Sequence, residues 1–110
     1  MMFIQYYGDT GQLPTNKNHV VFKWCGKGNI LFSITKKGNA ASCHFSCDKK
    51  GLRGLTQVID KFVKFVFSSF EWCRMVIAQI LKPSVARLVE KLGFIRITGN
   101  ESYQIYARLR

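Results

Sequence analysis

A short basic segment, DKKGLRG at residues 48–54, has the composition of an anion-binding loop. It carries three cations and two glycines: Lys49, Lys50, Arg53, Gly51 and Gly54. The segment directly precedes a stretch with helical spacing, and the first N–H groups of a helix have no partner inside it, so they can hold a phosphate. Basic side chains would add charge-assisted hydrogen bonds. The alternative is a solvated basic loop whose glycines only serve its turns.

The four cysteines form no CxxC pair, and the spacing of Cys43 and Cys47 suits neither a common zinc knuckle nor a thioredoxin motif. On a strand, both would share one face with Phe45 and behave as small buried hydrophobic groups. We therefore expect reduced core thiols and no metal cofactor. The first eight residues lack the basic start and the apolar run of a secretory signal peptide. These features together predict a cytoplasmic protein.

The chain is strongly basic, with a formal net charge of +11 from 17 Lys and Arg against 6 Asp and Glu. This balance favours an anionic partner: a phosphorylated cofactor, a nucleic acid or an acidic protein. A soluble basic domain without such a partner is the alternative. The 110 residues, 47% of them hydrophobic, fit one domain over residues 1–110 with a core of its own.

The elements that would position these residues alternate between strand and helix patterns. Residues 30–36 and 40–47 alternate apolar and polar side chains and are joined by a Lys37-Gly38-Asn39 turn. The period becomes helical from Leu55. Strands are predicted over 2–7, 20–24, 30–36, 40–47, 72–80, 94–98 and 102–109, with helices starting at Leu55 and Pro83 and an irregular stretch over 8–18. This order predicts a mixed α/β (α+β) sheet: an antiparallel meander, then a βαβ unit with parallel strands, then two closing strands.

The second predicted helix carries a recognisable motif. Its last residues, LVEKLGF at 88–94, resemble the second helix motif of the GNAT acetyltransferase superfamily, often written YEKLGF. The order strand, basic glycine loop, helix, strand, helix is similar to that family over about residues 19–110. Gly93 suits the left-handed position after a helix. The small, trimmed and basic form also resembles acetyltransferase-like proteins of bacteriophages, which would place it in the host cytoplasm.

The resemblance implies an acetyl-CoA site. In the family, the strand before the loop pairs with the pantetheine arm, which corresponds here to Phe45, Ser46 and Cys47. The loop and the following helix hold the pyrophosphate, and the start of the second helix also contacts the cofactor. The implied cofactor-binding residues are Phe45, Ser46, Cys47, Lys49, Lys50, Gly51, Leu52, Arg53, Gly54, Lys82 and Ser84.

Three departures from the family pattern concern the chemistry. The family loop, Q/R-x-x-G-x-G/A, fits in no register: with Lys49 first, Leu52 takes the middle position. The family tyrosine, often the acid for the departing thiolate, aligns with Val89, which transfers no proton. Two helices that usually wall the acceptor site do not fit in residues 8–18, so the substrate side is expected to be open or altered.

Candidate catalytic groups are few. His44 lies one residue before the pantetheine segment and is the best-placed base; a hydrogen-bonded sheet histidine is its alternative. Glu71, before the buried strand, is a second candidate base or a loop charge. Tyr103 is a substitute acid or packs with its neighbours on the last strand.

Three functions follow from these observations. The first is an N-acyltransferase that passes an acetyl group from acetyl-CoA to a small-molecule or protein amine. The second keeps the fold without catalysis, as a phage protein acting on a host factor or in the virion. The third, less favoured, is a nucleic-acid-binding module, because the basic residues are scattered and no RNA-binding signature is present. No membrane partner is expected.

Overall fold

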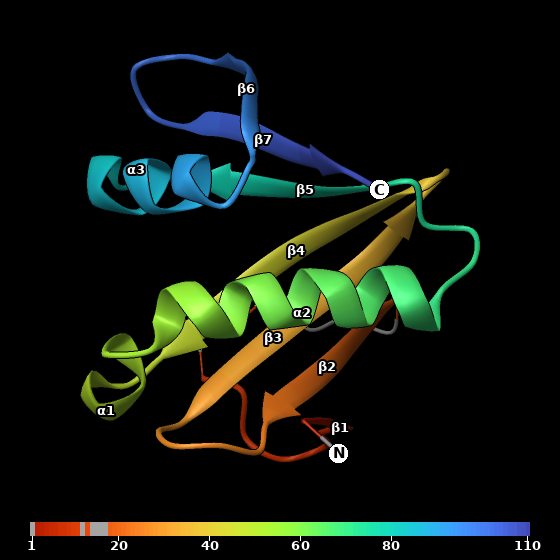
Figure 1. Cartoon of the computed structure of the whole chain (residues 1–110), viewed down its shortest axis with the longest axis vertical. Helices are drawn as coiled ribbons and strands as arrows, with labels where there is room; N and C mark the ends of the chain where they lie inside the picture. Colours follow the sequence, from red (N-terminus) through yellow and green to blue (C-terminus); the bar gives the residue numbers. More distant parts are fainter. Residues whose placement is uncertain (1, 12, 14–17) are drawn as a thin grey trace.

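A seven-stranded mixed sheet with the strand order β1-β2-β3-β4-β5-β7-β6 forms the centre of the computed structural model, which describes residues 2–11, 13 and 18–110 (Figure 1). Part of the irregular stretch predicted over 8–18 therefore lies outside the described residues. The strands are β1 (Phe3–Gln5), β2 (His19–Trp24), β3 (Ile30–Lys37), β4 (Ala40–Cys47), β5 (Met75–Ile80), β6 (Ile95–Gly99) and β7 (Gln104–Leu109). The helices are α1 (Lys49–Leu52), α2 (Leu55–Ser69) and α3 (Pro83–Lys91).

Strands β1 to β4 form the predicted antiparallel meander. The turn between β3 and β4 has Gly38 at a φ of 63°, a left-handed conformation that glycine adopts without steric cost. The predicted alternation is confirmed, because Ile30, Phe32 and Ile34 all belong to the main core. Ser33, on the opposite face, is fully buried as well. The meander thus presents an apolar face to the helix that follows.

Helix α2 covers this face, and its apolar stripe is buried against the sheet (Figure 1). The Phe62 ring stacks on Phe32 with centroids 4.0 Å apart and an interplanar angle of 9°. On the helix's outer flank, Asp60 accepts a hydrogen bond from Arg108 of β7 at 2.8 Å and pairs with Lys64 at 2.9 Å. The core and this ion pair fix α2 against both halves of the sheet.

Strands β4 and β5 are parallel, as the βαβ pattern predicts, but they pair only over their first residues. Ala40 to Cys43 lie beside Met75 to Ala78. Beyond Cys43, β4 continues to Cys47 beside β3 alone, while β5 pairs with β7 as far as Ile80. Figure 1 shows the two strands meeting at one end and diverging towards α1 and α3. The sheet is therefore split between its two central strands.

The structure corrects several predicted boundaries; the strand predicted over 2–7, for example, is only Phe3–Gln5. The segment 48–54 is not all loop, because Asp48 accepts a hydrogen bond from the Gly51 amide at 2.8 Å and caps the short helix α1. Strand β5 begins at Met75 rather than at 72, since Trp72 lies in a turn. Strand β7 begins at Gln104, so Tyr103 lies before it and not on it, and β6 runs over 95–99 rather than 94–98.

Helix α3 follows the predicted capping pattern. Pro83 occupies its first turn, where its missing N–H costs nothing, and Gly93 follows its end at a φ of 89°. Val89 is buried in the core and Phe94 packs beside it. The EKLGF segment thus docks α3 against the sheet. Among the described residues, no helix has both the length and the hydropathy needed to cross a membrane.

Candidate active site

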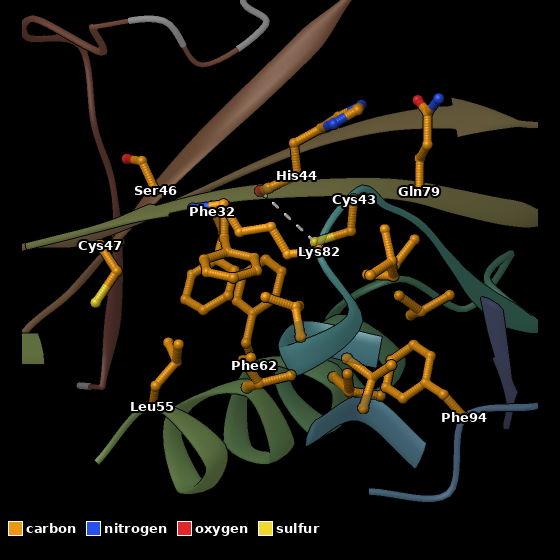
Figure 2. A pocket seen from close by; sticks show the side chains of 18 of the residues that line it. Phe32, Cys43, His44, Ser46, Cys47, Leu55, Phe62, Gln79, Lys82 and Phe94 are labelled. Atoms are coloured by element: carbon orange, nitrogen blue, oxygen red, sulfur yellow. Dashed lines mark hydrogen bonds between the residues drawn. The ribbon is translucent and has the colours of Figure 1, made fainter. Parts of the chain in front are cut away.

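A cavity of about 520 Å³ lies where β4 and β5 diverge. Its walls come from the free end of β4, the first half of α2, the end of β5 and the start of α3. Its lining is mostly apolar, with a few polar groups, which is typical of ligand pockets. Figure 2 shows that Cys43 and Cys47 point to the helix side of the sheet, whereas His44, Ser46 and Gln79 point to the other side. Because side chains from both faces line the cavity, it passes through the split in the sheet.

The three residues implied to pair with pantetheine, Phe45, Ser46 and Cys47, form the free end of β4. All three line the cavity, and their strand has no partner on the β5 side beyond Cys43. Every second residue of such an edge directs its N–H and C=O groups into the gap. An extended ligand with amide groups can therefore add to β4 as a strand does.

Beside this edge, a basic hollow of about 470 Å³ is lined by five residues: Lys27, Lys49, Lys50, Leu52 and Arg53. Helix α2 starts next to it, and its N-cap, Gly54, has no side chain to bond the first N–H groups. Those donors and the positive end of the helix dipole suit an anion such as a pyrophosphate. Lys27, from the turn before β3, was not among the predicted residues. It joins the hollow only because that turn packs against α1.

The two glycines of the segment 48–54 have different roles. A Cβ on Gly51 would lie 2.7 Å from the Cys47 Sγ and 2.7 Å from the Ile30 Cγ1, so this position is already filled. The Gly51 amide donates to Asp48, whose carboxyl also accepts from the Asn29 amide at 3.0 Å. These two hydrogen bonds hold the pKa of Asp48 below its usual value. A Cβ on Gly54, in contrast, would meet no atom within 4 Å. Gly51 therefore shapes the loop, while Gly54 faces open space where a ligand can approach.

His44 lies half-buried on the sheet face opposite α2, beside the split. Burial lowers the pKa of its imidazole, and the nearby His19 and Lys37 lower it further. The His19 and His44 rings are 6.5 Å apart. Since an unperturbed histidine titrates near ~6.5, a lowered pKa leaves His44 neutral at neutral pH and able to accept a proton. His19 was missed from the sequence because it enters the site across β3.

The thiols in the cavity are poor nucleophiles. Burial raises the pKa of Cys43 to about 12. Burial and the charge of Asp48 also raise the pKa of Cys47. The thiolate is the reactive form of cysteine, so both groups stay protonated and unreactive. Among the described residues, no group of His, Cys, Asp and Glu is arranged to hold a metal ion.

Three other predicted residues lie outside the cavity. Glu71 is exposed in the turn before β5, at the far end of α2 from the cavity wall. Tyr103 is half-buried in the turn before β7, and Ser84 is exposed in the first turn of α3. Lys82 and Val89 do line the cavity. The structure thus brings together His44, the β4 edge and Lys82, with the basic segment alongside.

Several solved N-acetyltransferase structures share this architecture. The Campylobacter jejuni N-acetyltransferase PseH in complex with acetyl coenzyme A matches with a TM-score of 0.71 and 13% identity, over 86% of this chain and 70% of that chain. A dodecameric spermidine N-acetyltransferase from Vibrio cholerae matches with a TM-score of 0.65 and 13% identity, over 86% and 66%. The GNAT domain of S. lividans PAT matches with a TM-score of 0.69 and 10% identity, over 84% and 61%.

No protein-family description and no curated protein matches the sequence itself. The likeness is therefore one of fold, and it confirms the prediction made from the EKLGF motif and the order of elements. The chain has the GNAT fold, with a split central sheet and with helices α2 and α3 in the order expected.

Proposed function

From this fold and its cavity, we propose that the protein is an acetyl-CoA-dependent N-acetyltransferase acting on a small-molecule or protein amine. The proposal is supported mainly by three neighbouring features: a basic hollow, a free strand edge and a split in the sheet. The basic hollow of Lys27, Lys49, Lys50 and Arg53 adjoins the free edge of β4, which leads to the split in the sheet. The anionic end, the amide-rich arm and the thioester of acetyl-CoA require these features in this order.

The residues that would hold the cofactor act by ordinary physical means. Phe45, Ser46 and Cys47 offer backbone hydrogen bonds to the pantetheine amides. The start of α2 and the lysines of the hollow bind phosphate oxygens. The bound cofactor supplies an activated acetyl thioester at the split. Of the implied residues, Gly51 contributes through loop shape, because its amide is already bonded to Asp48.

His44 is the base of the proposed reaction. An amine attacks the thioester carbon only as the free base, so its ammonium form must first lose a proton. The neutral imidazole lies beside the split on the sheet face away from α2, where an acceptor amine can approach a thioester held in the split. Between β1 and β2, the described residues contain no helix that would cover this face.

The test is calorimetric titration of CoA and acetyl-CoA into the protein at about physiological ionic strength, with duplex DNA as a polyanion control. We expect CoA to bind, and the paired variant Lys49→Gln/Arg53→Gln to weaken binding strongly. The matched control is Lys91→Gln, an exposed lysine at the end of α3. Acetylation is then followed with a panel of amines, comparing the protein with a His44→Gln variant.

Three results would redirect the proposal. Binding of DNA but not of CoA, falling steeply as salt rises, would indicate a nucleic-acid module. Binding of neither would favour an interaction protein that uses the fold without catalysis. Binding of CoA without acetylation of any amine, in the presence of an intact His44, would leave a cofactor-binding protein that is not an enzyme.

A further inference from the structure

Acetyl transfer creates a charge that the cavity must accommodate. When the carbon–sulfur bond of the thioester breaks, CoA leaves as a thiolate inside a mostly apolar cavity. An unpaired anion is costly to bury, so a group that offsets its charge or protonates it would accelerate the reaction. The need for a group that stabilises the thiolate rests on the proposed function. Which residue supplies that group can be judged from the side chains that line the cavity at the split.

Among the described residues that line the cavity, four have side chains that titrate: Cys43, His44, Cys47 and Lys82. The wall from α2 is apolar, with Leu55, Ile59, Phe62 and Val63, and α3 contributes Val85 and Val89. Neither Tyr103 nor any carboxylate is part of this lining. Candidates for the acid must therefore come from these four.

Three of the four are unsuited to meet a thiolate. Cys43 and Cys47 are neutral thiols and bring no positive charge to a departing thiolate, and burial raises the pKa of Cys43 to about 12. The pKa of Cys47 is raised as well. The pKa of His44 is lowered and its ring lies on the opposite face of the sheet, where it serves the amine.

Lys82 has the required position. It comes two residues after the end of β5, and its carbonyl accepts the first hydrogen bonds of α3, from the Val85 and Ala86 amides at 3.0 and 3.1 Å. Its backbone is thus fixed at the mouth of the split. Figure 2 shows its side chain extended across the cavity towards β4, alongside Cys43. The start of α3 adds the positive end of a helix dipole at the same place.

We propose that Lys82 is a catalytic residue, whose ammonium group faces the thioester sulfur and protonates the departing thiolate. The amine nitrogen bonds to the acetyl carbon, and the carbon–sulfur bond then breaks with its electron pair on sulfur. One proton passes from Lys82 to that sulfur, giving CoA-SH. The proton lost by the amine goes to His44 or to water, and Lys82 regains its proton from solvent. The sum is amine plus acetyl-CoA to amide plus CoA.

The first test measures the ionisation of bound CoA, not turnover. The thiolate absorbs in the ultraviolet, so its pKa in the complex can be titrated after subtracting the ligand-free protein, which removes Cys43 and Cys47. A cation beside the sulfur should lower the thiol pKa by about one unit or more, and Lys82→Met should abolish that shift. Lys91→Met is the matched control and should leave the shift unchanged. Thermal melting confirms that each variant is folded.

The second test separates proton transfer from cofactor binding. Lys82→Met should lower kcat at least about tenfold with a smaller change in the KM for acetyl-CoA. Lys82→Arg keeps the charge, so it should keep the lowered thiol pKa but also lose kcat, because a guanidinium does not give up its proton.

Specific outcomes would overturn the proposal. An unchanged thiol pKa in Lys82→Met, with CoA still bound, would show that Lys82 does not face the sulfur. A raised KM with unchanged kcat would make it a phosphate-binding cation only. A Lys82→Arg variant with full kcat would overturn the proton transfer. Failure of the unmodified protein to bind CoA would overturn the proposed function together with this one.

Discussion

Gly51 and Gly54 are three residues apart in one basic segment, and we predict that adding a methyl group to each has opposite consequences. In Gly51→Ala, the new Cβ would lie 2.7 Å from the Cys47 Sγ and 2.7 Å from the Ile30 Cγ1. The sulfur can move by rotation about one bond. Ile30 cannot move in the same way, because it is fully buried beneath the helix layer. The substitution therefore overpacks the core.

Overpacking of this kind costs about 1–3 kcal/mol of folding free energy. For a chain of this size, each 1 kcal/mol lowers the melting temperature by about 4–8 °C. We therefore expect Gly51→Ala to melt at least about 4 °C below the parent protein. The double variant Gly51→Ala/Cys47→Ala removes one of the two contacts and should recover part of the loss, so the pair couples in a double-mutant cycle.

Gly54→Ala should behave differently. Its Cβ meets no atom within 4 Å and the φ of Gly54 is −112°, so folding stability should change by less than about 1 kcal/mol in either direction. The methyl group does narrow the approach to the first N–H groups of α2, and the affinity for CoA should fall. Urea denaturation and calorimetry measure the two effects separately. A Gly51→Ala protein as stable as the parent, or a Gly54→Ala protein that binds CoA unchanged, would refute this division of roles.

The remaining predictions concern charge. Hydrogen bonds from Arg108 and Lys64 lower the pKa of Asp60, so the stabilisation that they give is complete above the unfolded pKa of about 4 and is lost as the pH falls through the folded pKa. Acid titration of stability should therefore be shallower for Asp60→Asn. Because the pKa of His44 is lowered, kcat/KM should rise with pH through a midpoint below ~6.5, and this limb should disappear in His44→Gln. The basic groups His19 and Lys37 both lower the pKa of His44, so a polyamine such as spermidine should be a poorer acceptor than an amine that also carries an anionic group. Equal kcat/KM for the two kinds of amine at low salt would contradict this last expectation.

The fold was readable from the sequence because local patterns and the architecture agree at most positions. The alternation in β3 and β4, the helical period from Leu55 and the Pro83 and Gly93 boundaries each indicate one element, and their order leaves few topologies. The errors fall where tertiary contacts decide. WCRMVIAQI is typical of one strand, yet Trp72 lies in a turn, Cys73 is buried before the strand, and the strand starts at Met75. The helix α1 depends on Asp48 as its cap, and a four-residue helix has too few residues to show a period.

The candidate site was readable only in part, because its residues meet through the split in the sheet. Sequence position could place Phe45 to Cys47 and the basic segment, since these follow one another along the chain. It could not show that β4 and β5 separate after Cys43, which is set by how each strand pairs with its other neighbour. Lys27 lies in the turn before β3 and His19 lies at the start of β2, so both are distant in sequence from the other site residues. Their place in the site depends on the packing of the turn before β3 against α1 and on the approach of the His19 ring to His44.

Val89 illustrates how a lost side-chain function can be replaced elsewhere in a cavity. As a valine, it fills the core and transfers no proton, so the residue that aligns with the family tyrosine cannot serve as the acid. The cavity nevertheless has one cation among its lining residues in the described part of the chain, Lys82, at the start of the same helix and on the same wall. A proton donor needs to reach the sulfur but need not come from one particular turn of α3, since distance and not sequence position governs proton transfer. A valine at this position is therefore weak evidence against catalysis. The pKa of the thiol in bound CoA is a stronger test of whether the cavity stabilises the leaving thiolate.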